Sequence, residues 1–263
     1  MTDARRSIEL EVEVAGTPEE VWRAIATGPG ITSWYVPHTV EERAGGIATA
    51  SFGPAPEMQI TGRVAAWDPP RRIVFDGGEG VEGFAFEWTI EARAGGTCVV
   101  RLVNSGFGSG AEWDEQYDAM TEGWRLFLLN LELHLAHFRG RIAVPMLPTA
   151  GWSATPDEAW ARLCRALGLP TDAVAGDRVA ATAAGAPSLA GTLVRVQPRA
   201  AAILLDEPAP GTAFVAVEGT GDQVQVSVWS YLYGPESTAI VGRDLPRWQD
   251  WLGEHAAASS STR

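Results

Sequence analysis

The chain has 263 residues, 46% of them hydrophobic and 20% charged, which is enough for two domains with separate cores. Its formal net charge of -13 repels phosphate backbones and anionic lipid surfaces, and this argues against nucleic-acid and membrane-surface partners. Cys98 and Cys164 lie far apart in apolar surroundings and predict buried thiols. No metal-ligand spacing, cofactor motif, signal peptide or bilayer-length apolar run occurs, so we expect a cytoplasmic protein with no cofactor and no bound metal.

The first half predicts a strand, a short helix, a series of strands and a long helix. Residues 8–14 alternate apolar residues with glutamates, as a half-buried strand does. Thr17-Pro18-Glu19-Glu20 has the pattern of a helix N-terminus with a capping box, and Gly28-Pro29-Gly30 is expected to end that helix. Apolar residues recur every three or four positions over 112–139, which predicts one amphipathic helix. The predicted strands between these helices are 38–42, 46–52, 57–67, 71–76, 83–92 and 97–105.

A meandering antiparallel sheet has one apolar face to bury, and a single long apolar helix is the simplest cover for it. The first half therefore predicts an α+β fold in which the sheet grips the last helix.

The second half repeats this pattern in degenerate form. Thr155-Pro156-Asp157-Glu158 repeats Thr17-Pro18-Glu19-Glu20, and a tryptophan follows each segment. A final helix containing Trp248 corresponds to the long helix containing Trp124. The order of these matches along the chain indicates a duplication.

The second copy is shorter than the first. It has no convincing counterpart of Ser33–Pro37, and two prolines weaken its first strand at Val144–Pro148. Pro246 must lie at the start of its final helix or bend it. We predict two domains, residues 1–141 and 142–263, with the larger cavity in the first.

Several of these motifs together resemble a known family. Thr17–Trp22, Trp34, Trp67–Phe75 and Gly123-Trp124 resemble the bacterial family named for the activator of heat-shock protein 90 ATPase, within the START-like (SRPBCC) superfamily. The resemblance is good over residues 7–139 and weak over 150–255. It implies a helix-grip fold, here twice in tandem, in which a curved antiparallel sheet surrounds a long C-terminal helix and leaves a tunnel. Relatives in that superfamily bind lipids, sterols, hormones or polyketides, and some are enzymes, so the fold does not decide the function.

Aromatic and methionine side chains on the elements that would face this tunnel are the main functional signal. Rigid rings combined with flexible methionines suit an apolar or aromatic small molecule. The alternative is that these side chains only fill the core. The candidate ligand-binding residues are Trp34, Phe52, Met58, Phe86, Trp88, Trp113, Tyr117, Met120 and Trp124, with Phe84 facing the same way.

Few polar residues are candidates for chemistry. His38 begins a strand near the expected tunnel mouth, where a general base is conceivable, although the sequence favours a surface histidine. His134 and His137 lie three apart on the long helix without a third metal ligand, which favours a solvated helix edge. Glu87 alternates with the aromatic residues and is expected to point away from them.

The sequence therefore predicts a protein whose first domain binds a hydrophobic or aromatic small molecule between sheet and helix. An enzyme that uses the same tunnel, such as a polyketide-type cyclase or hydrolase, is the alternative. It needs a titratable group inside the tunnel, and since none is evident the sequence favours a binding protein. A chaperone-assisting module that binds proteins is the third hypothesis.

We predict no binding of duplex DNA at nanomolar concentrations and physiological salt, because the net charge has the wrong sign for counterion release. A gel-shift titration tests this, and a retarded band in the nanomolar range would contradict it.

Overall fold

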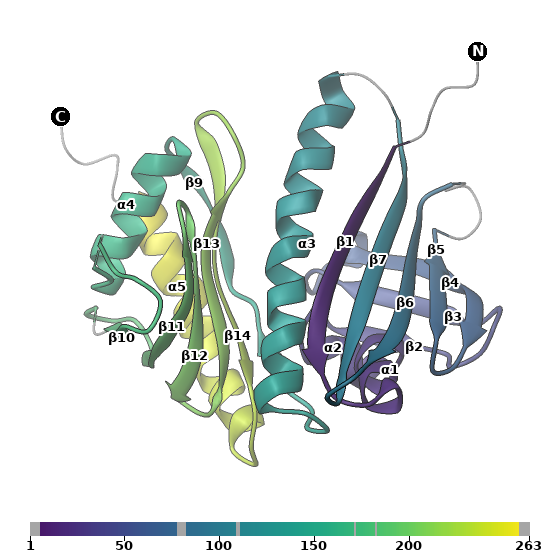
Figure 1. Ribbon diagram of the computed structural model, residues 1–263. Coiled ribbons are helices and arrows are strands. Elements are labelled where there is room, and N and C mark those ends of the chain that lie inside the picture. Colours follow the sequence, from purple (N-terminus) through teal and green to yellow (C-terminus); the bar gives the residue numbers. More distant parts are fainter. Residues whose placement is uncertain (1–5, 78–82, 109–110, 171, 182, 258–263) are drawn as a thin grey trace. The chain divides into compact units, whose positions relative to one another are not determined.

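The chain forms two compact units, residues 1–142 and 143–263, each made of one antiparallel sheet and a few helices (Figure 1). The computed structural model describes residues 6–77, 83–108, 111–170, 172–181 and 183–257. The first unit contains β1 (Arg6–Ala15), α1 (Pro18–Ala26), α2 (Gly28–Thr32), β2 (His38–Val40), β3 (Ile47–Ser51), the 3-10 helix η1 (Pro56–Met58), β4 (Gln59–Asp68), β5 (Arg72–Asp76), β6 (Ala85–Arg93), β7 (Thr97–Phe107) and α3 (Ala111–His137). The second contains β8 (Val144–Met146), β9 (Thr149–Ser153), α4 (Pro156–Leu167), β10 (Arg178–Ala181), β11 (Leu189–Gln197), β12 (Ala200–Glu207), β13 (Gly211–Glu218), β14 (Gln223–Leu232) and α5 (Ser237–Ala257).

The sheet of the first unit has the strand order β1-β7-β6-β5-β4-β3-β2, with every neighbouring pair antiparallel. Strands β2 to β7 follow one another as a meander, and β1 adds to the far side of β7. Figure 1 shows α3 alongside β1, β7 and β6, while β5 to β2 curl round at the other side of the sheet. This is the predicted helix grip, and α3 is its 27-residue helix.

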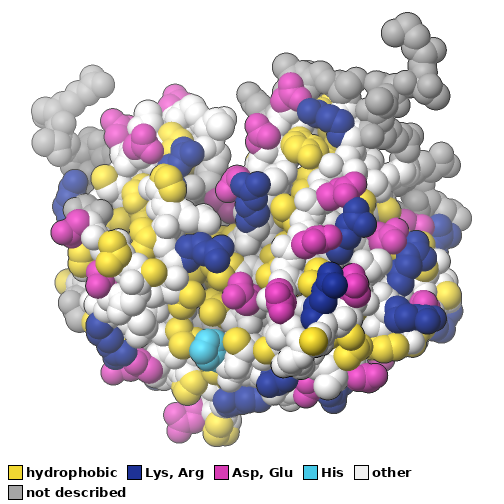
Figure 2. Space-filling model, viewed as in Figure 1, with side chains coloured by type: hydrophobic (Ala, Val, Ile, Leu, Met, Phe, Trp, Pro, Cys, Tyr) yellow, Lys and Arg dark blue, Asp and Glu magenta, His cyan; other side chains and the backbone are white. Residues whose placement is uncertain are grey.

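The two faces of this sheet differ in chemistry, as the alternation in β1 requires. Glu9 and Glu11 lie on the outer face, where Arg101 of β7 forms ion pairs with both. Arg72 of β5 likewise pairs with Glu87 of β6, which confirms that Glu87 points away from the aromatic face. Figure 2 shows basic and acidic side chains interleaved over these strands. The opposite, apolar face packs against the helices.

The core of the first unit lies between this apolar face and the helices α1 and α3. Leu128, Leu131 and Leu135 of α3 belong to one buried cluster with side chains from β1, β6 and β7. Trp22 of α1 packs edge-on against Trp67 of β4, with ring centroids 4.9 Å apart. Trp22 and Trp67, which belong to the motifs Thr17–Trp22 and Trp67–Phe75, therefore contribute to the core.

The first helix begins and ends as the sequence predicts, and a second short helix follows it. Thr17 and Glu20 form the capping box, in which the Thr17 hydroxyl accepts from the Glu20 backbone N–H and the Glu20 carboxylate accepts from the Thr17 N–H. The helix ends at Ala26, just before Gly28-Pro29-Gly30, as predicted, and these three residues then begin the separate short helix α2. The Thr27 side chain caps α2 by accepting from the Gly30 N–H, and a proline is well suited to the first turn.

The second unit has the same architecture with fewer elements. Its strand order is β10-β11-β12-β13-β14-β8, and β9 also pairs with β14. The segments β8 and β9 together take the place of β1, since the chain leaves the sheet at Leu147-Pro148 between them. The helices α4 and α5 correspond to α1 and α3, and α4 has the same capping box, at Thr155 and Glu158. The two halves are thus tandem helix-grip copies.

The second copy is reduced where the sequence suggests. Within the described residues, nothing between α4 and β10 corresponds to α2 and β2. Its final helix has 21 residues against 27 in α3. The sequence allowed Pro246 either at the start of the final helix or within it, and the structure places it inside α5. None of the helices in the described ranges combines the length and apolar character that crossing a membrane requires.

We predict that Thr17→Ala lowers the free energy of unfolding by about 1 kcal/mol, because the Glu20 N–H loses its acceptor. Thr17→Ser keeps a hydroxyl at this position and should lower it by clearly less. Chemical denaturation of the two variants measures the difference, and equal losses would contradict the role of the cap.

Candidate functional site

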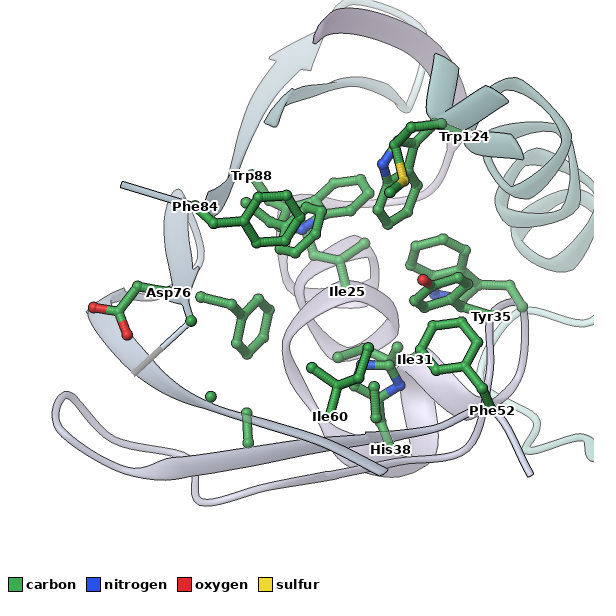
Figure 3. A pocket seen from close by; sticks show the side chains of 18 residues that line it. Ile25, Ile31, Tyr35, His38, Phe52, Ile60, Asp76, Phe84, Trp88 and Trp124 are labelled. Atoms are coloured by element: carbon green, nitrogen blue, oxygen red, sulfur yellow. The ribbon is translucent and has the colours of Figure 1, made fainter. Parts of the chain in front are cut away.

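A cavity of about 170 Å³ lies within the first unit, between its sheet and its helices (Figure 3). For comparison, an engineered core cavity of about 150 Å³ holds benzene. The cavity is lined by Ile25, Ile31, Trp34, Tyr35, His38, Ala48, Ala50, Phe52, Ile60, Gly62, Phe75, Asp76, Gly77, Phe84, Phe86, Trp88, Met120 and Trp124.

Small residues on the sheet create much of this space. His38, Ala50 and Ile60 are cross-strand partners on β2, β3 and β4, and therefore share one face. In the next such row, Ala48 lies opposite Gly62. Alanine and glycine have almost no side-chain volume, so the sheet does not reach the helices at these positions and a gap remains.

Aromatic rings form the opposite wall. Trp124 of α3 lies 5.5 Å from both Phe86 and Trp88 of β6, measured between ring centroids, and 5.1 Å from Tyr35. Trp34 approaches Trp88 edge-on at 5.6 Å. Such edge-to-face packing holds the rings rigidly and leaves their free surfaces towards the cavity.

The lining changes from buried to exposed along the cavity. Ile31 and Trp88 are each 4% exposed and lie at the inner end. Phe52, Ile60 and Met120 are 41%, 59% and 36% exposed, although they are large apolar residues. They come from three different segments and surround an apolar mouth. The cavity therefore opens to solvent through hydrophobic side chains.

Two polar side chains, Tyr35 and His38, enter this apolar space. In the described part of the chain, Asp76 is the one charged lining residue, and it forms an ion pair with Arg63 at 2.8 Å. Figure 3 shows the Asp76 carboxylate directed away from the rings. The chemistry available inside the cavity is therefore that of neutral hydrogen-bonding groups.

His38 has a defined protonation pattern. Its Nδ1 lies 2.8 Å from the backbone carbonyl of Val36, which can only accept, so Nδ1 carries the proton and Nε2 has a free lone pair. Burial lowers the pKa of the ring, and the imidazole is neutral at pH 7. The sequence favoured a surface position for His38; that expectation is wrong, because the ring lines the cavity beside Tyr35.

Tyr35 was not among the sequence candidates, although it has the most ring contacts in the site. It contacts the rings of Trp34, His38, Phe52, Trp124 and Phe127, at centroid distances between 4.4 and 6.1 Å. Burial raises the pKa of its hydroxyl, which stays protonated at physiological pH. The signal that could have identified Tyr35 was its place within Ser33–Pro37, the segment missing from the second copy.

Six of the nine sequence candidates lie together in the lining: Trp34, Phe52, Phe86, Trp88, Met120 and Trp124, and Phe84 joins them. They come from β6, α3 and the segments after α2 and β3.

Three candidates, Met58, Trp113 and Tyr117, do not line the cavity. Tyr117 lies about two helical turns before Trp124, and its hydroxyl donates to the Ser7 carbonyl at 3.1 Å. Trp113 is still farther along the helix and approaches the edge of Phe107. Met58 belongs to η1 and covers Gly53. The candidates on α3 share one face of the helix, but only its middle part, with Met120 and Trp124, borders the cavity.

Of the two histidines of α3, His134 differs from the expected solvated position and His137 does not. His134 is buried, and burial lowers its pKa to about 4, whereas His137 is exposed. His134 borders a second hollow of about 220 Å³ that also includes Arg23, Glu42 and Arg141. Among the described residues, no three His, Cys, Asp or Glu side chains gather to hold a metal ion. This mixed-charge hollow is unlike the apolar cavity.

Comparison with known proteins agrees with the resemblance found in the motifs. Residues 15–136, which lie within the first unit, match the sequence model of the family described as "Activator of Hsp90 ATPase homolog 1-like protein". This match confirms the resemblance for the first half of the chain. No curated protein matches the chain significantly.

Solved structures similar to this chain include single-domain and two-domain proteins. The Aha1 dimer from Colwellia psychrerythraea is 17% identical, with a TM-score of 0.43 over 51% of this chain and 99% of that chain. The di-domain ARO/CYC BexL from the BE-7585A biosynthetic pathway is 14% identical, with a TM-score of 0.43 over 97% and 95%. DynU16 from the dynemicin biosynthetic locus is 16% identical, with a TM-score of 0.42 over 96% and 96%.

We predict that Trp124→Ala lowers the free energy of unfolding by about 3–5 kcal/mol, because this 4% exposed ring packs against four others. Trp113→Ala removes a 37% exposed ring of the same helix and should cost at most about 1 kcal/mol. Urea denaturation compares the two. Similar small losses would show that Trp124 borders open space without packing.

Proposed function

We propose that the first unit binds a hydrophobic or aromatic small molecule in the cavity between its sheet and α3. The observation that carries the proposal is an apolar cavity with an open, apolar mouth. Side chains that served only as core filling would close the space, as interiors normally pack without voids of this volume. In this proposal residues 1–141 are the ligand-binding domain and residues 142–263 are a second, shortened copy.

The size of the cavity sets the class of ligand. About 170 Å³ accommodates one or two fused rings without rearrangement of the lining. Larger molecules would extend through the mouth past Phe52, Ile60 and Met120, which are already exposed. Burying about ten methylene equivalents at ~0.8 kcal/mol each, less the cost of association, gives dissociation constants in the micromolar range.

Catalysis in the same cavity is the second candidate function, and His38 is the observation that favours it. A neutral imidazole with a free Nε2 lone pair inside an apolar site meets the requirements of a general base. Asp76 does not serve this purpose, since it is paired with Arg63 and directed away. Without a second group aligned on a reacting atom, binding remains the function that the site supports best.

We predict that Ala50→Phe weakens binding of naphthalene at least tenfold, because Ala50 lines the cavity and a phenyl ring there occupies much of its volume. Isothermal titration calorimetry measures the affinity, with wild type expected in the micromolar range.

Thr49→Phe is the matched control. Thr49 is the neighbour of Ala50 on β3 and its hydroxyl contacts that of Thr61 on the other face, so the same added ring stays outside the cavity. We expect its affinity to remain within twofold of wild type. Equal losses in both variants, or no binding to wild type, would refute the proposed site.

A further inference from the structure

We infer that the cavity selects a neutral aromatic molecule bearing a hydroxyl group, recognised by Tyr35 together with Trp88 and His38. This inference rests on the proposed function and specifies its ligand class. It follows from the hydrogen-bonding groups of the lining that the protein itself leaves unused.

The three indoles of the cavity differ in how their N–H groups are used. Trp34 Nε1 donates to the Ala24 carbonyl at 2.9 Å, and Trp124 Nε1 donates to the buried Asn104 side chain at 3.3 Å. Trp88 Nε1 has no acceptor among the described residues, and this nitrogen is not one of the fully buried polar atoms. Since only 4% of Trp88 is exposed and that residue lines the cavity, its free N–H is available there.

The Tyr35 hydroxyl is a second unused donor. This hydroxyl has no hydrogen-bond partner within the described ranges, although the tyrosine ring that carries it contacts five other aromatic rings. Figure 3 shows its oxygen directed towards the middle of the cavity. A ligand that fills the cavity must offer these two donors an acceptor or leave them buried and unpaired, which is unfavourable, so a ligand oxygen is preferred there.

His38 supplies the complementary group. Because its Nδ1–H is used by Val36, its Nε2 can accept a hydrogen bond from a ligand. A phenolic hydroxyl accepts through its lone pairs and donates through its proton, so it can use either kind of group in the cavity. A pure hydrocarbon can use neither.

The charged groups of the lining disfavour a ligand that carries a carboxylate. Among the described lining residues there is no lysine or arginine, and the one carboxylate, that of Asp76, is paired with Arg63. A carboxylate ligand would be buried without a cation, which is far less favourable than burying a neutral hydroxyl that is hydrogen-bonded. The cavity therefore favours neutral phenols over aromatic or fatty acids.

The test compares naphthalene, 2-naphthol and 2-naphthoate by calorimetry at pH 7. The readout is the ratio of the naphthalene to the 2-naphthol dissociation constant. We expect Tyr35→Phe to reduce this ratio about three- to tenfold, the value of one neutral hydrogen bond, while naphthalene affinity stays within twofold. We expect 2-naphthoate to bind wild type at least tenfold more weakly than 2-naphthol.

Tyr117→Phe is the matched control, because its hydroxyl donates to Ser7 outside the cavity. It should leave the ratio unchanged. A second comparison needs no variant: 2-methoxynaphthalene cannot donate to His38 and should bind wild type more weakly than 2-naphthol.

The outcomes separate the two claims. If naphthalene binds but the ratio is the same in wild type and Tyr35→Phe, the role of Tyr35 is refuted and the apolar site stands. If 2-naphthoate binds as tightly as 2-naphthol, the selection of neutral ligands is refuted. If none of the compounds binds wild type, the proposed function fails and this inference fails with it.

Discussion

A curved sheet and a straight helix cannot remain in contact along their whole length, and the first unit is organised around this constraint. Trp124 joins α3 to the sheet through Phe86 and Trp88, whose rings lie 5.5 Å away. Where the sheet curls towards β3 and β4, its inner face carries alanines and a glycine in place of large residues. The aromatic contact fixes the distance between the sheet and α3. Where the sheet carries small residues, part of the space between them stays unfilled and forms the cavity.

The same constraint has a different outcome in the second unit. Trp248 occupies the place of Trp124 on the final helix, and it is completely buried with its ring 5.6 Å from that of Trp251. The described residues of this unit include no counterpart of α2 and β2, which in the first unit flank Trp34 and Tyr35 and, in β2, include His38. Loss of one segment therefore removes both a wall and the polar groups attached to it.

Residues 33–38, which follow α2 and include the first residue of β2, thus carry most of the polar groups of the candidate site. They are fixed from both sides, since Trp34 donates to Ala24 of α1 and its carbonyl accepts from Asn130 of α3. Rigid anchoring allows Tyr35 and His38 to keep polar atoms in an apolar space without moving to satisfy them elsewhere. Sites of this kind, with few polar groups in a rigid apolar wall, are typical of small-molecule recognition.

The sequence by itself determined the elements of the first unit and their order, and it showed that the second unit repeats them in reduced form. Alternation located the strands of the first unit to within about two residues, the capping residues located α1 and α4, and the repeated pattern revealed the duplication. These signals are local, because each depends on residues a few positions apart. The aromatic candidates on β6 and on the middle of α3 were found in the same way, since an apolar face can be recognised from its period.

Only the tertiary structure decided where two apolar faces touch and where they separate. Tyr117 and Trp124 lie on the same stripe of α3, yet only Trp124 borders the cavity, because the sheet curves relative to the helix. His38 looked like a surface residue until the cross-strand register placed it beside Ala50 and Ile60. A cavity forms where side chains from segments far apart in the sequence do not fill the space between them, and a local sequence pattern carries no information on such distant packing.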